Sequence, residues 1–151
     1  MSSLTTAQLS TFKAAINADA NLAAFRSTGD AYQIALYYNQ PSSPVVSIWR
    51  PQISIKELNA AVVWSAYAAL TVANQNAYMA MTQGGYVDAT AANIRNGFSS
   101  IFGAGATLTA LTALASINST RLEALFTTSA VTTVFGVRVT DSDVTAALNG
   151  P

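Results

Sequence analysis

The side chains that could do acid–base chemistry in this chain are carboxylates and lysines, because its 151 residues include 0 His and 0 Cys. Asp141 and Asp143 form a close acidic pair. A hard divalent cation needs several converging oxygens, and no further acid lies nearby in the sequence. Carboxylates at a helix start instead accept hydrogen bonds from free backbone N–H groups. Since Thr140 precedes the pair, we interpret it as a capping box of a terminal helix.

Glu57 and Glu123 are the remaining candidates for a general acid and base. The spacing of Ser54 and Glu57 is that of a second capping box, which already accounts for Glu57. Glu123 is expected on a helix surface beside Arg121. The sequence therefore predicts no catalytic residues, no cofactor and no metal site, and a protein that is not an enzyme.

The charges are few and balanced. Seven Lys and Arg residues match seven Asp and Glu residues, and charged residues make up 9% of the chain. No basic excess is present to neutralise a phosphate backbone, so sequence-specific nucleic-acid binding is not expected. A net charge of zero also gives little electrostatic resistance to self-association. This balance favours a structural or assembly role.

The longest uncharged stretch runs from Leu58 to Val87. It is long enough for a membrane helix, which needs about 20 apolar residues. However, Asn74, Gln75 and Asn76 lie at its centre, and an unpaired amide in hydrocarbon costs about 2–7 kcal/mol. The flanks also lack the basic cluster that sets membrane orientation. We predict a buried central helix, and the pattern leaves open whether it breaks between Thr71 and Asn76.

The other elements follow from local signals. Short helices are predicted over the first forty residues, starting at the capping box of Thr5 and Gln8. Prolines make residues 40–52 an extended arm. Further helices are expected from Asp88 or Thr90 to Phe102 and from about Thr107 to Phe126. Residues 130–151 should form a β-hairpin or bent strand and a terminal helix turn. The predicted fold is mainly α: a single domain, 1–151, built as a helical bundle around a long central helix.

Two segments carry residue types that are typical of protein interfaces. Aromatic and Arg side chains dominate interface hot spots, and the C-terminal strand has few polar residues to block pairing with another subunit. Packing on the chain's own core is the alternative for both segments. The candidate subunit-interface residues are Tyr37, Tyr38, Trp49, Arg50, Val131, Val134, Phe135, Val137 and Val139.

Three stretches together resemble a known group of proteins. They are YYNQPSSP at 37–44 followed by Trp49-Arg50, NIRNGF at 93–98, and TRLEALFT at 120–127 leading into FG at 135–136 and TDSDV at 140–144. In this order they resemble small virion proteins of tailed bacteriophages, of the head–tail connector or adaptor kind.

The resemblance implies a mainly helical, non-enzymatic subunit of a homo-oligomeric ring in the virion neck. Such a ring bridges the portal protein and the tail, is assembled in the bacterial host cytoplasm, and uses extended arms to reach neighbouring subunits. The arm at 40–52 and the C-terminal segment are the matching pieces here. The alternatives are another tail, decoration or minor capsid protein, a holin-like membrane protein that uses Leu58–Val87 as a span, and an enzyme.

Overall fold

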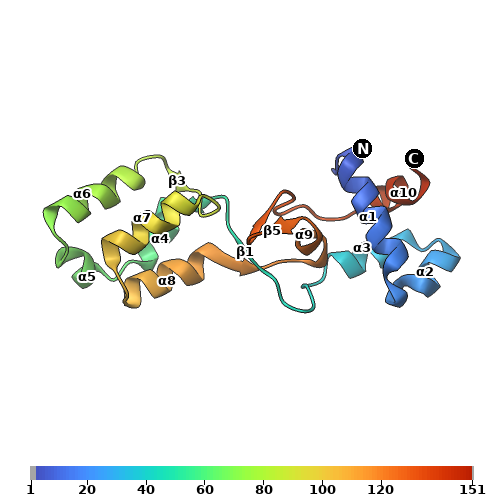
Figure 1. Ribbon diagram of the computed structural model, residues 1–151, viewed down its shortest axis with the longest axis horizontal. Coiled ribbons are helices and arrows are strands. Elements are labelled where there is room, and N and C mark those ends of the chain that lie inside the picture. Colours follow the sequence, from blue (N-terminus) through green and yellow to red (C-terminus); the bar gives the residue numbers. More distant parts are fainter. Residues whose placement is uncertain (1–2, 151) are drawn as a thin grey trace. The chain divides into compact units, whose positions relative to one another are not determined.

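Helices form most of the chain in the computed structural model, which confirms the predicted mainly α class (Figure 1). The structure describes residues 3–150, so the predicted domain limits at 1 and 151 lie outside the described residues. The chain divides into two compact units, where the sequence predicts a single domain. One unit contains residues up to Val46 and from Asn118 onward, and the other contains Ser47–Ile117.

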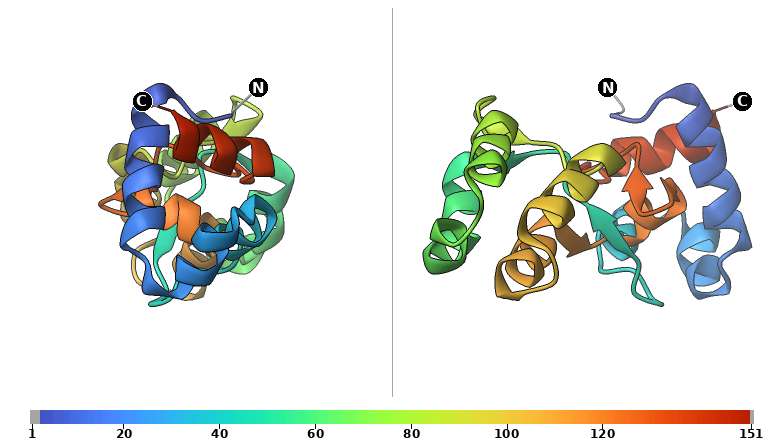
Figure 2. Two further views of the ribbon diagram at one scale, coloured as in Figure 1. Left: turned by 90° about the vertical axis from the view of Figure 1, so that its right-hand side faces the viewer. Right: turned by 60° about the vertical axis from the view of Figure 1, so that its left-hand side comes forward.

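The first unit is built from both ends of the chain. Its elements are α1 (Thr6–Ala18), the 3-10 helix η1 (Ala20–Leu22), α2 (Ala23–Thr28), α3 (Ala31–Tyr38), α9 (Arg121–Leu125), β5 (Thr127–Thr128), β6 (Val131–Thr132) and α10 (Asp141–Asn149). The C-terminal helix α10 packs against α1 and α3 (Figure 2). Their inward side chains, including Phe12, Ile16, Ile34 and Val144, have no exposed surface.

The second unit is continuous in sequence. Its elements are β1 (Ser47–Trp49), β2 (Ile53–Ser54), α4 (Ile55–Ala61), α5 (Trp64–Ala68), α6 (Val72–Met81), β3 (Tyr86–Val87), α7 (Ala92–Phe102), α8 (Ala106–Ala115) and most of β4 (Ser116–Asn118), whose last residue belongs to the first unit. β1 pairs with β4, and β2 pairs antiparallel with β3 so that Ile53 lies opposite Val87. The main helix contacts are those of α4 with α8, α6 with α7 and α7 with α8.

Capping boxes begin several of these helices, because a Ser or Thr and the residue three positions later satisfy each other's free backbone donors. The predicted boxes at Thr5, Ser54 and Thr140 are all confirmed. A fourth box, Thr120 with Glu123, begins α9 and was not predicted.

The predicted long central helix is not present, because the uncharged run forms the three helices α4, α5 and α6. The first break lies at Val62 and Val63, whose backbones are extended and whose β-branched side chains have a lower helix propensity. The second break is at Thr71, whose hydroxyl accepts the Asn74 amide N–H at 3.3 Å and starts α6. No helix within residues 3–150 is long and apolar enough to cross a membrane.

The helix predicted from about Thr107 to Phe126 is also divided. α8 ends at Ala115, β4 follows, and α9 begins only at Arg121. Pairing with the extended arm explains the interruption. In the first unit the Ser42 amide donates to the Ser119 carbonyl at 2.9 Å, and in the second the Arg50 amide donates to the Ala115 carbonyl at 2.8 Å. The arm is extended, as predicted.

The predicted C-terminal β element is smaller and begins earlier than expected. Its hairpin joins β5 and β6, with Thr127 opposite Thr132. Ser129 and Ala130 form the turn with positive φ angles of 52° and 63°. The terminal helix, predicted from the capping box at Thr140 through Leu148, is present as α10, which ends at Asn149.

Candidate interaction surface

Large apolar side chains are exposed along α5, α6 and the segments beside them, and none of these segments carries a charge. No charged residue occurs between Leu58 and Val87. We call this region, with the segments on either side of the two helices, the uncharged surface. Its large exposed side chains are Val63, Trp64, Val72, Met79 and Tyr86. The uncharged run therefore contains exposed apolar side chains, although its lack of charge led us to predict a buried helix.

The two sides of α6 differ sharply in exposure. Val72 and Met79 are seven residues apart, which is about two helical turns, so they lie on the same side of α6. They are 71% and 55% exposed, and Asn76 between them is also exposed. Tyr78 is 2% exposed. α6 thus contributes one buried aromatic residue to the core and presents an uncharged, partly apolar side outward.

A cluster of aromatic rings holds α5 and α6 on the second unit. The Tyr78 ring lies edge-on to Tyr67, Phe98 and Phe102, with centroid distances of 5.4, 6.1 and 5.6 Å. Its hydroxyl donates to Asn59 Oδ1 at 2.8 Å. Burial raises the pKa of Tyr78, and the neighbouring Tyr67 adds to the effect. Edge-to-face aromatic pairs add about 0.5–1.5 kcal/mol each beyond burial, so the uncharged surface rests on a well-packed layer.

Two of the three central amides bind carbonyl groups of the same unit. Asn74 Nδ2 donates to the Ile101 carbonyl at 3.3 Å, and Gln75 Nε2 donates to the Tyr67 carbonyl at 3.3 Å. Asn76 is exposed. These amides therefore connect α6 to α7 and α5, and only Asn76 is presented outward.

The predicted interface residues Tyr37 and Tyr38 have different environments in the first unit. Tyr38 lies in the core, with its ring edge-on to Phe12 at a centroid distance of 4.8 Å, and burial raises its pKa to about 12. Tyr37 is half-buried, and its hydroxyl donates to Asp19 Oδ2 at 2.7 Å. The Arg121 guanidinium carbon lies 3.8 Å from the Tyr37 ring centroid. Of the two, Tyr37 remains accessible to a partner.

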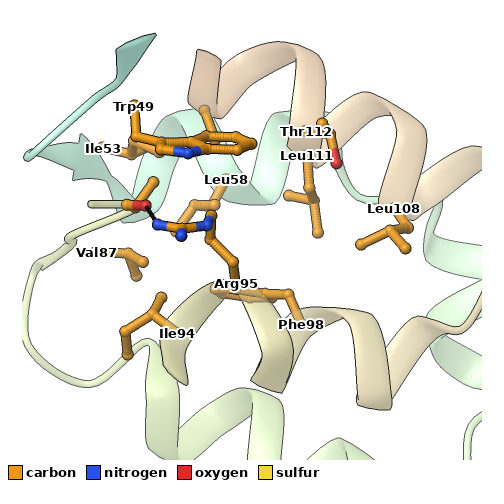
Figure 3. A pocket seen from close by; sticks show the side chains of 12 residues that line it. Trp49, Ile53, Leu58, Val87, Ile94, Arg95, Phe98, Leu108, Leu111 and Thr112 are labelled. Atoms are coloured by element: carbon orange, nitrogen blue, oxygen red, sulfur yellow. Dashed lines mark hydrogen bonds between the residues drawn. The ribbon is translucent and has the colours of Figure 1, made fainter. Parts of the chain in front are cut away.

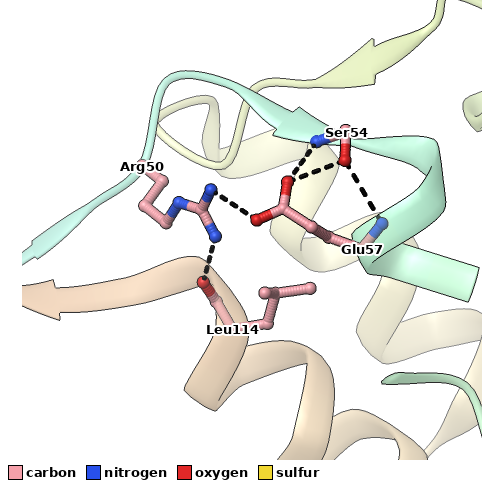
Figure 4. Close-up of polar contacts among 4 residues, drawn as sticks. All are labelled: Arg50, Ser54, Glu57 and Leu114. Carbon is pink, nitrogen blue, oxygen red and sulfur yellow. Dashed lines mark hydrogen bonds and ion pairs between the residues drawn. The ribbon is translucent and has the colours of Figure 1, made fainter. Parts of the chain in front are cut away.

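The predicted interface residues Trp49 and Arg50 lie in the second unit. Arg50 Nη2 is 2.9 Å from Glu57 Oε1, and Arg50 Nη1 donates to the Leu114 carbonyl at 3.2 Å (Figure 4). The hydrogen bond from the Ser54 hydroxyl, followed by the one from Arg50, lowers the pKa of Glu57 to about 2. Arg50 thus links α4 to α8, and Trp49 is half-buried against Arg95.

The predicted C-terminal interface residues pack largely on their own unit. Val134 and Val139 are buried in the core of the first unit, and Val137 packs against that core. Val131 and Phe135 are half-buried. Side-chain hydrogen bonds fix this segment, because Asn39 donates to the Val139 carbonyl at 2.9 Å and accepts its N–H at 2.8 Å.

Glu123 is buried, and the expectation that it lies on a helix surface is wrong. Its Oε2 accepts the Thr120 N–H at 2.8 Å, and its Oε1 accepts the Gly136 N–H at 2.8 Å. Its own carbonyl accepts the hydroxyls of Thr127 and Thr132. A buried carboxylate needs such partners, so Glu123 organises the turn between α9 and the C-terminal segment.

The acidic pair Asp141 and Asp143 begins α10, which confirms its interpretation as part of a capping box. Asp143 is buried, and its Oδ2 accepts the Thr140 N–H at 2.9 Å. Among residues 3–150, no group of three or more acidic, His or Cys side chains is placed to hold a metal ion. Comparison of the chain with protein-family models, curated proteins and solved structures finds no match.

Proposed function

We propose that this chain is a non-enzymatic structural protein of a tailed-bacteriophage virion, a head–tail connector or adaptor subunit that forms a ring with copies of itself. The observation that carries the proposal is the uncharged surface of α5 and α6. The resemblance of three segments to connector proteins and the balanced, sparse charge support it. The expected neighbours of the ring are the portal protein and the tail or neck proteins, and the expected location is the virion.

The composition of the uncharged surface is that of a protein interface. Large exposed apolar patches mark interaction sites, and interface cores are enriched in Trp, Tyr and Met and depleted of charge. Trp64 is 53% exposed and Met79 is 55% exposed. Both are residue types that contribute strongly when they are buried against a partner.

The charge distribution favours a second copy of the chain as the partner that binds the uncharged surface. The net charge is zero, so two copies do not repel each other as they approach. A surface without charges also leaves no buried unpaired charge on contact. In a ring, each copy uses two different patches. The uncharged surface of one copy would then meet a different patch on the next, for which the accessible Tyr37 and Phe135 are candidates.

The test is size-exclusion chromatography with light scattering on the full chain and on two matched variants. Trp64→Lys places a charge on the uncharged surface, whereas Tyr32→Lys places one at a comparably exposed aromatic residue of the first unit. We expect the unmodified chain and Tyr32→Lys to form the same oligomer and Trp64→Lys to dissociate. A monomeric unmodified chain, or equal behaviour of the two variants, would contradict the proposal.

Imaging of the oligomer distinguishes a connector from other virion roles. A closed ring with a central opening supports the connector. An open helical filament would favour a tail-tube role, because a head-to-tail contact that does not close propagates indefinitely.

A further inference from the structure

The second unit contains a small, mostly apolar cavity with one cationic side chain in its wall (Figure 3). Its volume is about 60 Å³. One water needs roughly 10–15 Å³, so the cavity can hold a group larger than a single water. The apolar part of its lining includes Ile53, Leu58, Phe98, Leu108 and Leu111. These side chains offer no hydrogen bonds to water, which favours an apolar occupant.

Arg95 provides the polar part of the lining. Its Nη1 donates to the carbonyls of Ala89 and Thr90 at 2.6 and 2.7 Å, which fixes the guanidinium in place. The guanidinium carbon lies 4.8 Å from the centroid of the Trp49 ring. Among residues 3–150, no acceptor binds its Nε or Nη2. Arg95 therefore holds a fixed position and retains donors for a ligand.

Acidic groups do not compete for these donors. The acids of the second unit are Glu57 and Asp88. Glu57 binds Arg50 and Ser54, and Asp88 Oδ1 accepts the Thr90 N–H at 2.8 Å. Neither of them lines the cavity. The cavity thus combines an apolar interior with a positive charge that has no carboxylate partner.

We propose that this cavity binds a small organic carboxylate whose apolar body is a short alkyl chain, which suits its volume of about 60 Å³. The apolar body occupies the space between Phe98, Leu108 and Leu111, and the carboxylate accepts hydrogen bonds from Arg95. A planar guanidinium suits a carboxylate because it can donate two parallel hydrogen bonds. Trp49 covers the guanidinium, so its indole reports on the site.

The test uses Trp49 as a fluorescent probe in the full chain. The sequence contains 2 Trp, so a Trp64→Phe variant leaves Trp49 as the single tryptophan. Butyrate is titrated as the probe ligand, with 1-butanol as an uncharged analogue of similar shape. We expect a saturable change in Trp49 emission and an affinity for butyrate about tenfold or more above that for 1-butanol, since only the carboxylate forms a charge-assisted hydrogen bond with Arg95.

Three variants, each made in the Trp64→Phe chain, test whether the ligand binds in this cavity. Arg95→Met should lower the affinity for butyrate to that for 1-butanol, whereas Lys56→Met, at an exposed lysine outside the cavity, should leave the butyrate affinity unchanged. Ala115→Val keeps Arg95, narrows the cavity, and should weaken both ligands. Circular dichroism confirms that each variant is folded.

Several results would overturn the proposal: no saturable signal with butyrate in the folded parent, equal affinities for butyrate and 1-butanol, unchanged butyrate binding in Arg95→Met, or unchanged binding in Ala115→Val. None of these results bears on ring assembly, which is read from light scattering.

Discussion

Removing the carboxylate of Glu123 should destabilise the protein far more than removing that of Glu57, although the two residues occupy the same position in similar capping boxes. Glu123 Oε2 accepts the Thr120 N–H at 2.8 Å, and Glu57 Oε2 accepts the Ser54 N–H at 2.9 Å. Their surroundings differ, because Glu123 is 5% exposed and the Glu57 side chain is 42% exposed.

The expected magnitude follows from the hydrogen bonds that are lost. Glu123→Ala leaves the N–H groups of Thr120 and Gly136 without their acceptor. A donor left unsatisfied away from water costs about 1–3 kcal/mol, so the free energy of unfolding should fall by about 2–4 kcal/mol for these partly buried groups. Glu57→Ala should have a smaller effect, because water replaces the exposed carboxylate.

Urea denaturation followed by far-UV circular dichroism measures this difference. Glu123→Gln should lie between the parent and Glu123→Ala, since an amide retains one oxygen and can keep only one set of the hydrogen bonds. An equal loss of stability in Glu57→Ala and Glu123→Ala, or a loss below about 1 kcal/mol in Glu123→Ala, would contradict a stabilising role for the buried hydrogen bonds of Glu123.

Three further predictions concern the core, acid stability and one helix end. Phe12 is fully buried against Tyr38, so Phe12→Ala should cost about 3–5 kcal/mol in urea denaturation; a loss below about 1 kcal/mol would contradict this packing. The pKa of Glu57 is lowered from 4.5 to about 2. The ionised Glu57 carboxylate therefore stabilises the protein fully above pH 4.5, and this contribution is lost as the pH falls through about 2. Unfolding followed by tryptophan fluorescence should show this acid sensitivity in the parent and not in Glu57→Gln. Gly29 has a φ of 69° and open space around it. Gly29→Ala should therefore lower the stability by about 1 kcal/mol through backbone strain alone, which thermal unfolding measures. An unchanged unfolding midpoint would contradict the left-handed conformation of Gly29.

Local signals in the sequence predict helix starts well in this chain. The capping boxes at Thr5, Ser54 and Thr140 need only residues three apart, so they do not depend on the rest of the fold. The box at Thr120 was missed because the leucine spacing continues from α8 into α9 and suggests one unbroken helix. Pairing of the intervening β4 with β1 is a long-range contact that periodicity does not show.

The position of the uncharged run could not be predicted in the same way. A lack of charge indicates that a segment can be buried, but exposure depends on what the remaining chain has available to cover it. Trp64 and Met79 read as core residues in the sequence and are exposed, whereas Glu123 reads as a surface residue and is buried. The hydrogen bond that Glu123 accepts from the Gly136 N–H comes from a turn that the neighbours of Glu123 in the sequence do not specify.

The proposed role of the chain is that of a ring-forming component of a virion neck. Electron microscopy of purified particles, made from the genome that encodes this chain, tests this role when combined with mass spectrometry of the same particles. We predict that the chain is present in the particles and accounts for a ring of density between portal and tail. Its absence from purified particles, or its density elsewhere on the capsid or tail, would contradict this role.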